Sequence, residues 1–361
     1  MTASPRANNF DALRLLAAAT VIFSHSFLIA EGNDHREPLI VMSGNQSIFG
    51  LAGVFVFFAI SGFLVTQSYE ATRAPLAFLA KRALRIFPGL FVALVVSGFV
   101  LAPLVSTLPL AEYFRRPEPW RYVFWNMLLD LRQHELPRTM FVNNPVGLEI
   151  NGSLWTLRYE VEMYLMVLVL GVARLLILPV MLGLLALGLA CIYFPSLDVL
   201  GGWGWTLSFF ASGMILYRLR DTRILDARIA LAALVALILT VRFGGFIQFF
   251  SLTGCYLAIF LALDRRLPVI PAARFGDLSY GLYIYGWPSE QAVIWALGGH
   301  AAWWQVSGLG LLLAGVMAFL SWHLIERPAL SLKQGSSRPA HRIGLVRPST
   351  SLRFAQDEDV S

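Results

Sequence analysis

The first apolar stretch of the sequence carries three ionisable residues, Asp11, Arg14 and His25. In a helix, Arg14 and His25 project within about 20° of each other, and Asp11 falls about 40° from His25, so all three share one face. His25 lies about 16 Å beyond Arg14 along the axis. Histidine is the usual general base near neutral pH, and charged groups in apolar stretches are functional candidates. His25 is therefore a candidate catalytic base. A structural alternative stays open, in which Asp11 pairs with Arg14 and His25 makes a packing hydrogen bond.

A second candidate group lies near the start of the apolar stretch 153–172. Arg158 and Glu162 are four residues apart and can neutralise each other on a helix. Glu160 projects from nearly the opposite face, without such a local partner, so we take it as functional. In their helices, His25 lies about 7 Å and Glu160 about 10 Å from the outer end. At this shared depth we expect the Glu160 carboxylate to orient the His25 imidazole as a catalytic pair.

Two arginines follow the second apolar stretch. Arg82 and Arg85 are three residues apart, in what we expect to be a cytoplasmic loop at the membrane surface. Two guanidinium groups side by side suit a ligand that carries phosphate. The alternative is that they only contribute to the positive charge that orients a membrane protein.

The composition defines what must position these residues. The chain has 361 residues, of which 57% are hydrophobic and 14% are charged, against about 25% charged in soluble domains. A transmembrane helix takes about 20 apolar residues, so we predict an all-α polytopic membrane protein with about ten transmembrane helices. The apolar stretches lie at about 10–30, 48–69, 84–106, 153–172, 175–194, 202–218, 227–243, 246–263, 278–297 and 304–325.

The basic residues predict the orientation. Most of them fall between the stretches on the side of the N-terminus, which places both termini in the cytoplasm. Their scatter argues against nucleic-acid binding. We expect one transmembrane domain over 1–332, with an extracytoplasmic or interfacial loop at 107–152 rich in aromatic and arginine residues. The Ser/Arg/Pro-rich tail, 333–361, is expected to be disordered and cytoplasmic. Cys191 and Cys255 lie in apolar stretches and imply no disulfide framework.

Six segments of the sequence form a series. They are Phe10–Ala18 with Phe23–His25, Phe57–Leu64, the Arg82/Arg85 pair, Ser153–Tyr164, Leu278–Tyr285 and Glu326–Pro328. In this order they resemble the motifs of the acyltransferase 3 family, whose polytopic members O-acylate bacterial surface sugars and other acceptors. One departure is the Gly286–Pro288 segment, where many members carry a histidine, so we transfer no role to that position.

The resemblance implies a membrane O-acyltransferase of the bacterial inner membrane, with acyl-CoA, usually acetyl-CoA, as donor and no metal. It implies that Arg82 and Arg85 bind the CoA phosphates and that Arg14 lines the path of the pantetheine arm. His25 would deprotonate an acceptor hydroxyl, and Glu160 stands at the glutamate of the family motif. The implied acceptor is a sugar or glycolipid of the cell envelope or of an exported polysaccharide, reached from the lipid or the outer face. Oligomeric state is left open.

A proton-coupled transporter is the alternative from another functional class. Histidine, glutamate and arginine inside the membrane are equally expected there. Transporters generally show internal repeats and paired broken helices, and the sequence shows neither pattern. We therefore favour the enzyme.

Overall fold

The computed structural model describes residues 8–130, 136–147, 149–198 and 201–335. Helices make up the regular structure of these ranges, where the β-type pairing is limited to one isolated bridge between Ser106 and Met140. The predicted disorder of the tail falls mostly on 336–361, outside the described residues.

The helices follow the apolar stretches of the sequence. The long ones are α1 (Phe10–Glu31), α3 (Phe49–Thr72), α4 (Pro75–Val96), α8 (Trp155–Val172), α9 (Leu178–Tyr193), α10 (Trp203–Leu219), α11 (Ala227–Phe243), α14 (Ser279–Ala296) and α15 (Trp303–Ser321). The shorter ones are α2 (Pro38–Ser43), α5 (Ala102–Val105), α6 (Leu110–Arg115), α7 (Glu118–Met127), α12 (Phe246–Phe249), α13 (Cys255–Leu263) and α16 (Arg327–Gly335). Three π-helical turns, Ser97–Leu101, Phe250–Gly254 and Trp322–Glu326, join α4 to α5, α12 to α13 and α15 to α16.

The helical membrane fold predicted from the sequence is confirmed. Five helical segments of the described chain are long and apolar enough to cross a membrane: Phe10–Glu31, Phe49–Thr72, Pro75–Val105, Phe246–Leu263 and Trp303–Leu332. A helix lies at each of the other five predicted stretches as well. The count of ten crossings stays a prediction. The closely spaced stretches are separated by turns, with Arg174 after α8 and Gly244 and Gly245 after α11 all at positive φ.

The third predicted stretch begins too late. Helix α4 starts at Pro75, nine residues before the predicted start at 84, so Arg82 and Arg85 are helical residues and do not lie in a loop. Proline is favoured in the first helical turn, because its φ is already helical and its missing N–H has no partner there anyway. The segment from Pro75 to Ala83 contains good helix formers and no glycine.

The aromatic part of the 107–152 loop forms the short helix α7. Trp120 and Phe124 are exposed on this helix, whereas Tyr122 is fully buried. Exposed rings on one side of a short helix are typical of an element lying at a membrane interface. Its position relative to a membrane stays a prediction.

Helices α3 and α10 pack closely through glycine. A Cβ at Gly62 would lie 2.0 Å from the carbonyl oxygen of Phe210, and one at Gly213 would lie 2.0 Å from that of Ala59. Small residues let the backbones of membrane helices approach each other. The Phe55 ring of α3 also stacks on the Phe209 ring of α10, with 3.7 Å between the ring centres. The α3–α10 pair therefore forms a rigid support for the helices that line the site.

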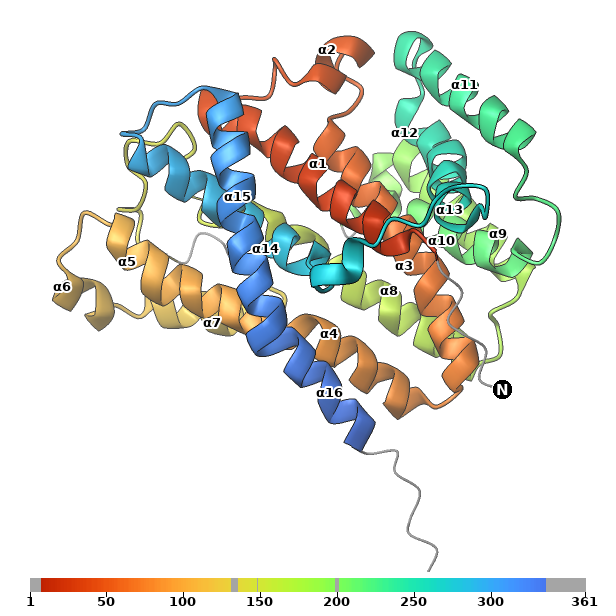
Figure 1. Ribbon diagram of the computed structural model, residues 1–361, viewed down its shortest axis with the longest axis horizontal. Coiled ribbons are helices and arrows are strands. Elements are labelled where there is room, and N and C mark those ends of the chain that lie inside the picture. The colour runs from red at the N-terminus through yellow and green to blue at the C-terminus, as the bar shows by residue number, and fades with distance from the viewer. Residues whose placement is uncertain (1–7, 131–135, 148, 199–200, 336–361) are drawn as a thin grey trace, which may run out of the picture.

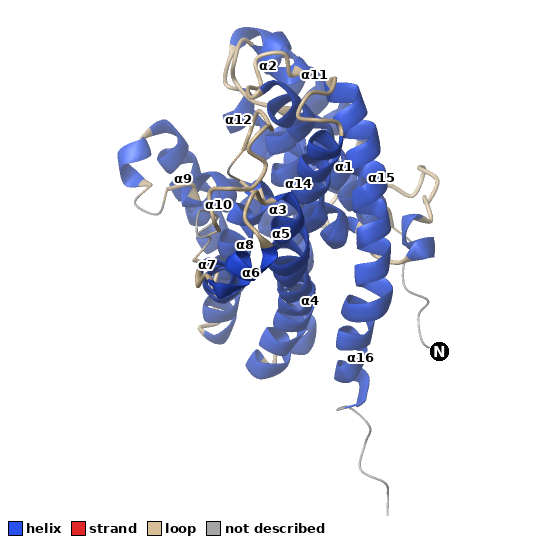
Figure 2. Cartoon of the chain, turned by 90° about the vertical axis from the view of Figure 1, so that its left-hand side faces the viewer, coloured by secondary structure: helices blue, strands red, loops and turns tan. Residues whose placement is uncertain are grey.

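The buried carboxylate of Glu37 fixes the end of α1 that carries His25. Its Oε1 accepts hydrogen bonds from Ser24 Oγ at 3.3 Å and from Phe49 N at 2.8 Å, while its Oε2 caps the first turn of α2. One side chain thus ties α1, α2 and the start of α3 together. Figure 2 shows α2 and α11 at one end of the molecule, with α4 and α16 at the opposite end. Figure 1 shows α15 and α16 as one long rod that reaches that second end.

Substitution of Gly213 by alanine should destabilise the fold, because the new methyl group would collide with the backbone of α3. Overpacking of this kind costs about 1–3 kcal/mol. Thermal unfolding in detergent should show a lowered midpoint. Gly315→Ala is the matched control, since a Cβ at Gly315 meets no atom within 4 Å. Equal midpoints for the two variants would contradict the close contact.

Candidate active site

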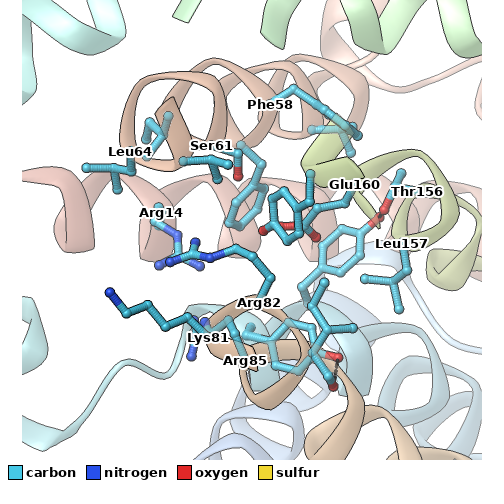
Figure 3. A pocket seen from close by; sticks show the side chains of 18 of the residues that line it. Arg14, Phe58, Ser61, Leu64, Lys81, Arg82, Arg85, Thr156, Leu157 and Glu160 are labelled. Carbon is cyan, nitrogen blue, oxygen red and sulfur yellow. Dashed lines mark hydrogen bonds between the residues drawn. The ribbon is translucent and has the colours of Figure 1, made fainter. Parts of the chain in front are cut away.

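The candidate site is a cavity of about 290 Å³ between α1, α3, α4, α8, α14 and α16. Four of the five residues singled out in the sequence line it: Arg14, Arg82, Arg85 and Glu160. Figure 3 shows three of them, Arg14, Arg82 and Arg85, gathered on one side with Lys81, whereas Phe58, Thr156 and Leu157 lie on the other side. The cavity therefore has a cationic part and a part where apolar side chains are joined by hydroxyl groups and the carboxylate of Glu160.

Two of the cavity arginines share a carboxylate that the sequence analysis did not identify. Arg14 Nη1 and Arg85 Nη2 both donate to Asp277 Oδ2, at 3.1 and 2.7 Å. Ser279 Oγ donates to the other oxygen of Asp277 at 2.7 Å. Burial by itself raises the pKa of Asp277, but the two guanidinium groups outweigh it and hold that pKa well below its usual range. Asp277 is therefore ionised and ties α1 and α4 to the start of α14.

A second carboxylate completes this ion-pair network; it belongs to the last of the six motif segments, Glu326–Pro328, but no role was assigned to it from the sequence. Glu326 accepts a hydrogen bond from Arg85 at 3.3 Å and another from Ser321 at 2.9 Å, and its side chain is 2% exposed. Placing a glutamate at the end of an apolar stretch costs free energy. This cost was the signal in the sequence that marks Glu326 as a functional candidate. Asp277 directly precedes one of the recognised motifs, but nothing local marks it as a partner of Arg14.

Glu160 has a local partner, contrary to the sequence-based expectation. The Tyr164 hydroxyl, one turn later on α8, donates a hydrogen bond to its carboxylate. Both residues line the cavity. The prediction overlooked this bond because only charged partners were considered. The predicted Arg158–Glu162 ion pair is confirmed at 2.9 Å, on a more exposed face of α8.

His25 lies outside the cavity and does not pair with Glu160. Its ring packs edge-on against Trp287 of α14, with 4.9 Å between the ring centres. Its buried Nδ1 has no hydrogen-bond partner among the described residues. The expected pair does not form, because two residues at equal depth in their helices can still face in different directions around the helix axes. The rotation of α8 turns Glu160 into the cavity instead.

A hydrogen bond joins two side chains that line the cavity on α8 and α14. Thr156 and Tyr283 join their hydroxyl groups at 2.8 Å, and the Phe57 ring lies 5.7 Å from that of Tyr283. All three residues line the cavity. Trp287 stands one turn beyond Tyr283 on α14, about 6 Å along the axis, and contacts His25. The candidate base therefore contacts a residue one helical turn beyond Tyr283, the last residue of α14 that lines the cavity.

The arrangement suits a ligand with an anionic head and a slender, less polar arm. Phosphate groups would meet the cationic part, and the arm would extend toward Tyr283 and His25. Among the described residues, no group of three or more histidine, cysteine, aspartate or glutamate side chains could hold a metal ion. Both cysteines are buried and free.

The sequence comparisons agree with the motifs. The family described as "Acyltransferase domain" matches residues 8–327. An "O-acetyl transferase" of Shigella phage Sf6 is 28% identical over 341 residues, covering 90% of this chain and 97% of that protein. "Nodulation protein 10" of Rhizobium leguminosarum bv. viciae is 30% identical over 385 residues, covering 94% and 97%. No solved structure matches. The chain thus belongs to the acyltransferase domain family that its motifs resemble, and it is an acyltransferase.

Proposed function

We propose that this enzyme is a membrane O-acetyltransferase. It moves an acetyl group from cytoplasmic acetyl-CoA to a hydroxyl of a cell-envelope or exported polysaccharide sugar, or of its lipid-linked precursor. The observation that carries this proposal is the cavity, which is lined by the arginines and by Tyr283, one turn of α14 before Trp287. Trp287 contacts His25, whose buried Nδ1 has no hydrogen-bond partner among the described residues. The printed name of the phage relative, "O-acetyl transferase", supports the acetyl group.

The proposed topology has ten transmembrane helices in the bacterial inner membrane, with both termini in the cytoplasm. Helices at all ten predicted stretches support the count. The excess of basic residues on the side of the N-terminus supports the orientation. In this orientation the cationic part of the cavity opens toward the cytoplasm, where acetyl-CoA is present.

In the proposed reaction, His25 accepts the proton of an acceptor hydroxyl as general base. The hydroxyl oxygen attacks the thioester carbonyl carbon, the carbon–sulfur bond breaks, and the CoA thiolate leaves and takes up a proton. The cationic residues of the cavity, among them Arg14, Arg82 and Arg85, line the donor site. We assign Glu160 to the donor cavity, because its carboxylate is bonded to Tyr164. In this proposal the hydrogen bond between Thr156 and Tyr283 must break, or the thioester must move around it, before the thioester reaches His25.

The function is tested by supplying purified protein with acetyl-CoA labelled in the acetyl group, together with polysaccharide from a strain that lacks the gene. Label should appear as an alkali-labile ester on the sugar only with the active protein. If the protein bound acetyl-CoA but transferred no label to any sugar, acetyl-CoA would remain the proposed donor and this class of acceptor would be rejected. An absence of acetyl-CoA binding by the folded protein would reject the proposal. Proton-linked flux of a solute would then have to be tested.

Substitution of His25 by glutamine should abolish transfer but leave acetyl-CoA binding intact, because His25 lies outside the cavity. Loss of a general base typically costs 10²–10⁴-fold in rate, roughly. The turnover number and the donor dissociation constant should be measured separately. His35→Gln is the matched control, since His35 is exposed in the loop after α1. Wild-type turnover in His25→Gln would remove this residue from the mechanism.

Substitution of Glu160 by glutamine separates its two possible roles. The structure predicts an altered KM for acetyl-CoA and no shift in the pH dependence of kcat that reports His25. A carboxylate that oriented the imidazole would instead shift that pH dependence. Glu162→Gln serves as control, because Glu162 pairs with Arg158 outside the cavity. A shifted pH profile in Glu160→Gln alone would restore the His25–Glu160 pair expected from the sequence.

A further inference from the structure

The four basic residues of the cavity differ in what neutralises them. Arg14 and Arg85 are bound to Asp277, and Arg85 also to Glu326, at distances between 2.7 and 3.3 Å. Their positive charges are therefore compensated by carboxylates of the protein itself. A ligand anion that took over these arginines would leave two largely buried carboxylates without their cations, which is strongly unfavourable.

Lys81 and Arg82 have no such carboxylate. Lys81 Nζ donates to the hydroxyl of Thr72 at 2.7 Å, and Arg82 Nη2 makes a long hydrogen bond of 3.4 Å to Ser68. Within the part of the chain that the structure describes, neither residue forms an ion pair with a carboxylate. Among the described residues, the buried Nε of Arg82 has no hydrogen-bond acceptor. These two positive charges of the cavity wall are thus not held in ion pairs within the described chain.

Aromatic rings hold the Arg82 guanidinium in place. Its Cζ lies 5.6 Å from the ring centre of Tyr164 and 5.9 Å from that of Phe78. Both distances are within the range in which a cation is attracted to a ring face. Figure 3 shows Lys81 and Arg82 extending in the same direction from α4. The two groups are therefore arranged to meet one anion from neighbouring positions of the helix.

We propose that Lys81 and Arg82 bind the phosphate groups of the donor, whereas Arg14 and Arg85 form an ion-paired wall that Asp277 and Glu326 keep in position. The proposal rests on the proposed function, since it divides the cationic residues of the same donor site. Phosphate oxygens accept strong, charge-assisted hydrogen bonds from ammonium and guanidinium groups. The pair Arg82 and Arg85 expected from the sequence is thereby replaced by Lys81 and Arg82.

The experiment compares two donors that share the thioester and the pantetheine arm. Acetyl-CoA carries phosphates, and S-acetylpantetheine carries none. Both are titrated into the purified full-length protein in detergent by calorimetry, with weak binding measured by competition. Lys81→Gln should weaken the binding of acetyl-CoA about tenfold or more, the loss of one hydrogen bond to a charged group. It should leave the affinity for S-acetylpantetheine unchanged, and Lys81→Arg should retain acetyl-CoA binding.

Arg265→Gln is the matched control for the loss of one positive charge. Arg265 is exposed in the loop after α13 and does not line the cavity. An equal loss in Arg265→Gln would assign the effect to net charge and overturn the proposal. Unchanged acetyl-CoA affinity in Lys81→Gln would overturn the proposal as well, and so would an equal weakening of the binding of both donors. In either case, binding of acetyl-CoA by the wild-type protein would still support the proposed function. Failure of the wild-type protein to bind acetyl-CoA would instead reject the proposed function itself.

Discussion

The candidate site depends on the ion pairs that the carboxylate of Asp277 forms. One of its oxygens accepts hydrogen bonds from Arg14 on α1 and Arg85 on α4, and the residue lies just before α14. Three helices that are far apart in the sequence therefore meet at one ion-pair network. Without this carboxylate, two partly buried guanidinium groups would repel each other inside an apolar helix bundle. The shape of the cavity follows from their neutralisation.

This constraint also divides the site along its length. Arg14 and Arg85 are ion-paired, Lys81 and Arg82 form no ion pair within the described chain, and the opposite part of the cavity contains the hydrogen bond between Thr156 and Tyr283. His25 lies one turn of α14 beyond that bond, against Trp287. In the proposed mechanism, donor recognition by Lys81 and Arg82 on α4 and proton transfer by His25 on α1 are therefore carried by different helices.

The sequence was informative where structure is local. Long apolar runs predict helices, and the helices are found at those runs because no polar backbone group can remain unpaired in a membrane. The Arg158–Glu162 pair was predictable from its spacing of four residues, and so was the Glu160–Tyr164 bond, had hydroxyl partners been considered. The start of α4 was misplaced, because the charged residues near 81–85 were taken as the end of the membrane helix.

The long-range pairing was not predictable from one sequence. Arg14 and Asp277 are 263 residues apart, and only the packing of α1 against α14 brings them together. The expected His25–Glu160 pair is the opposite error, a predicted contact that the structure does not contain. Depth along a helix follows from residue number, but the rotation of one helix against its neighbours does not. That rotation is set by close contacts such as those of Gly62 and Gly213.

The most direct test of the account is a structure of the protein with acetyl-CoA bound. The account predicts phosphate groups in contact with Lys81 and Arg82, an unbroken bridge from Asp277 to Arg14 and Arg85, and a thioester near Tyr283 on the side of His25. Phosphates bound to Arg14 and Arg85 with Asp277 displaced would contradict the division of the cationic residues. A donor bound outside the cavity would contradict the site itself.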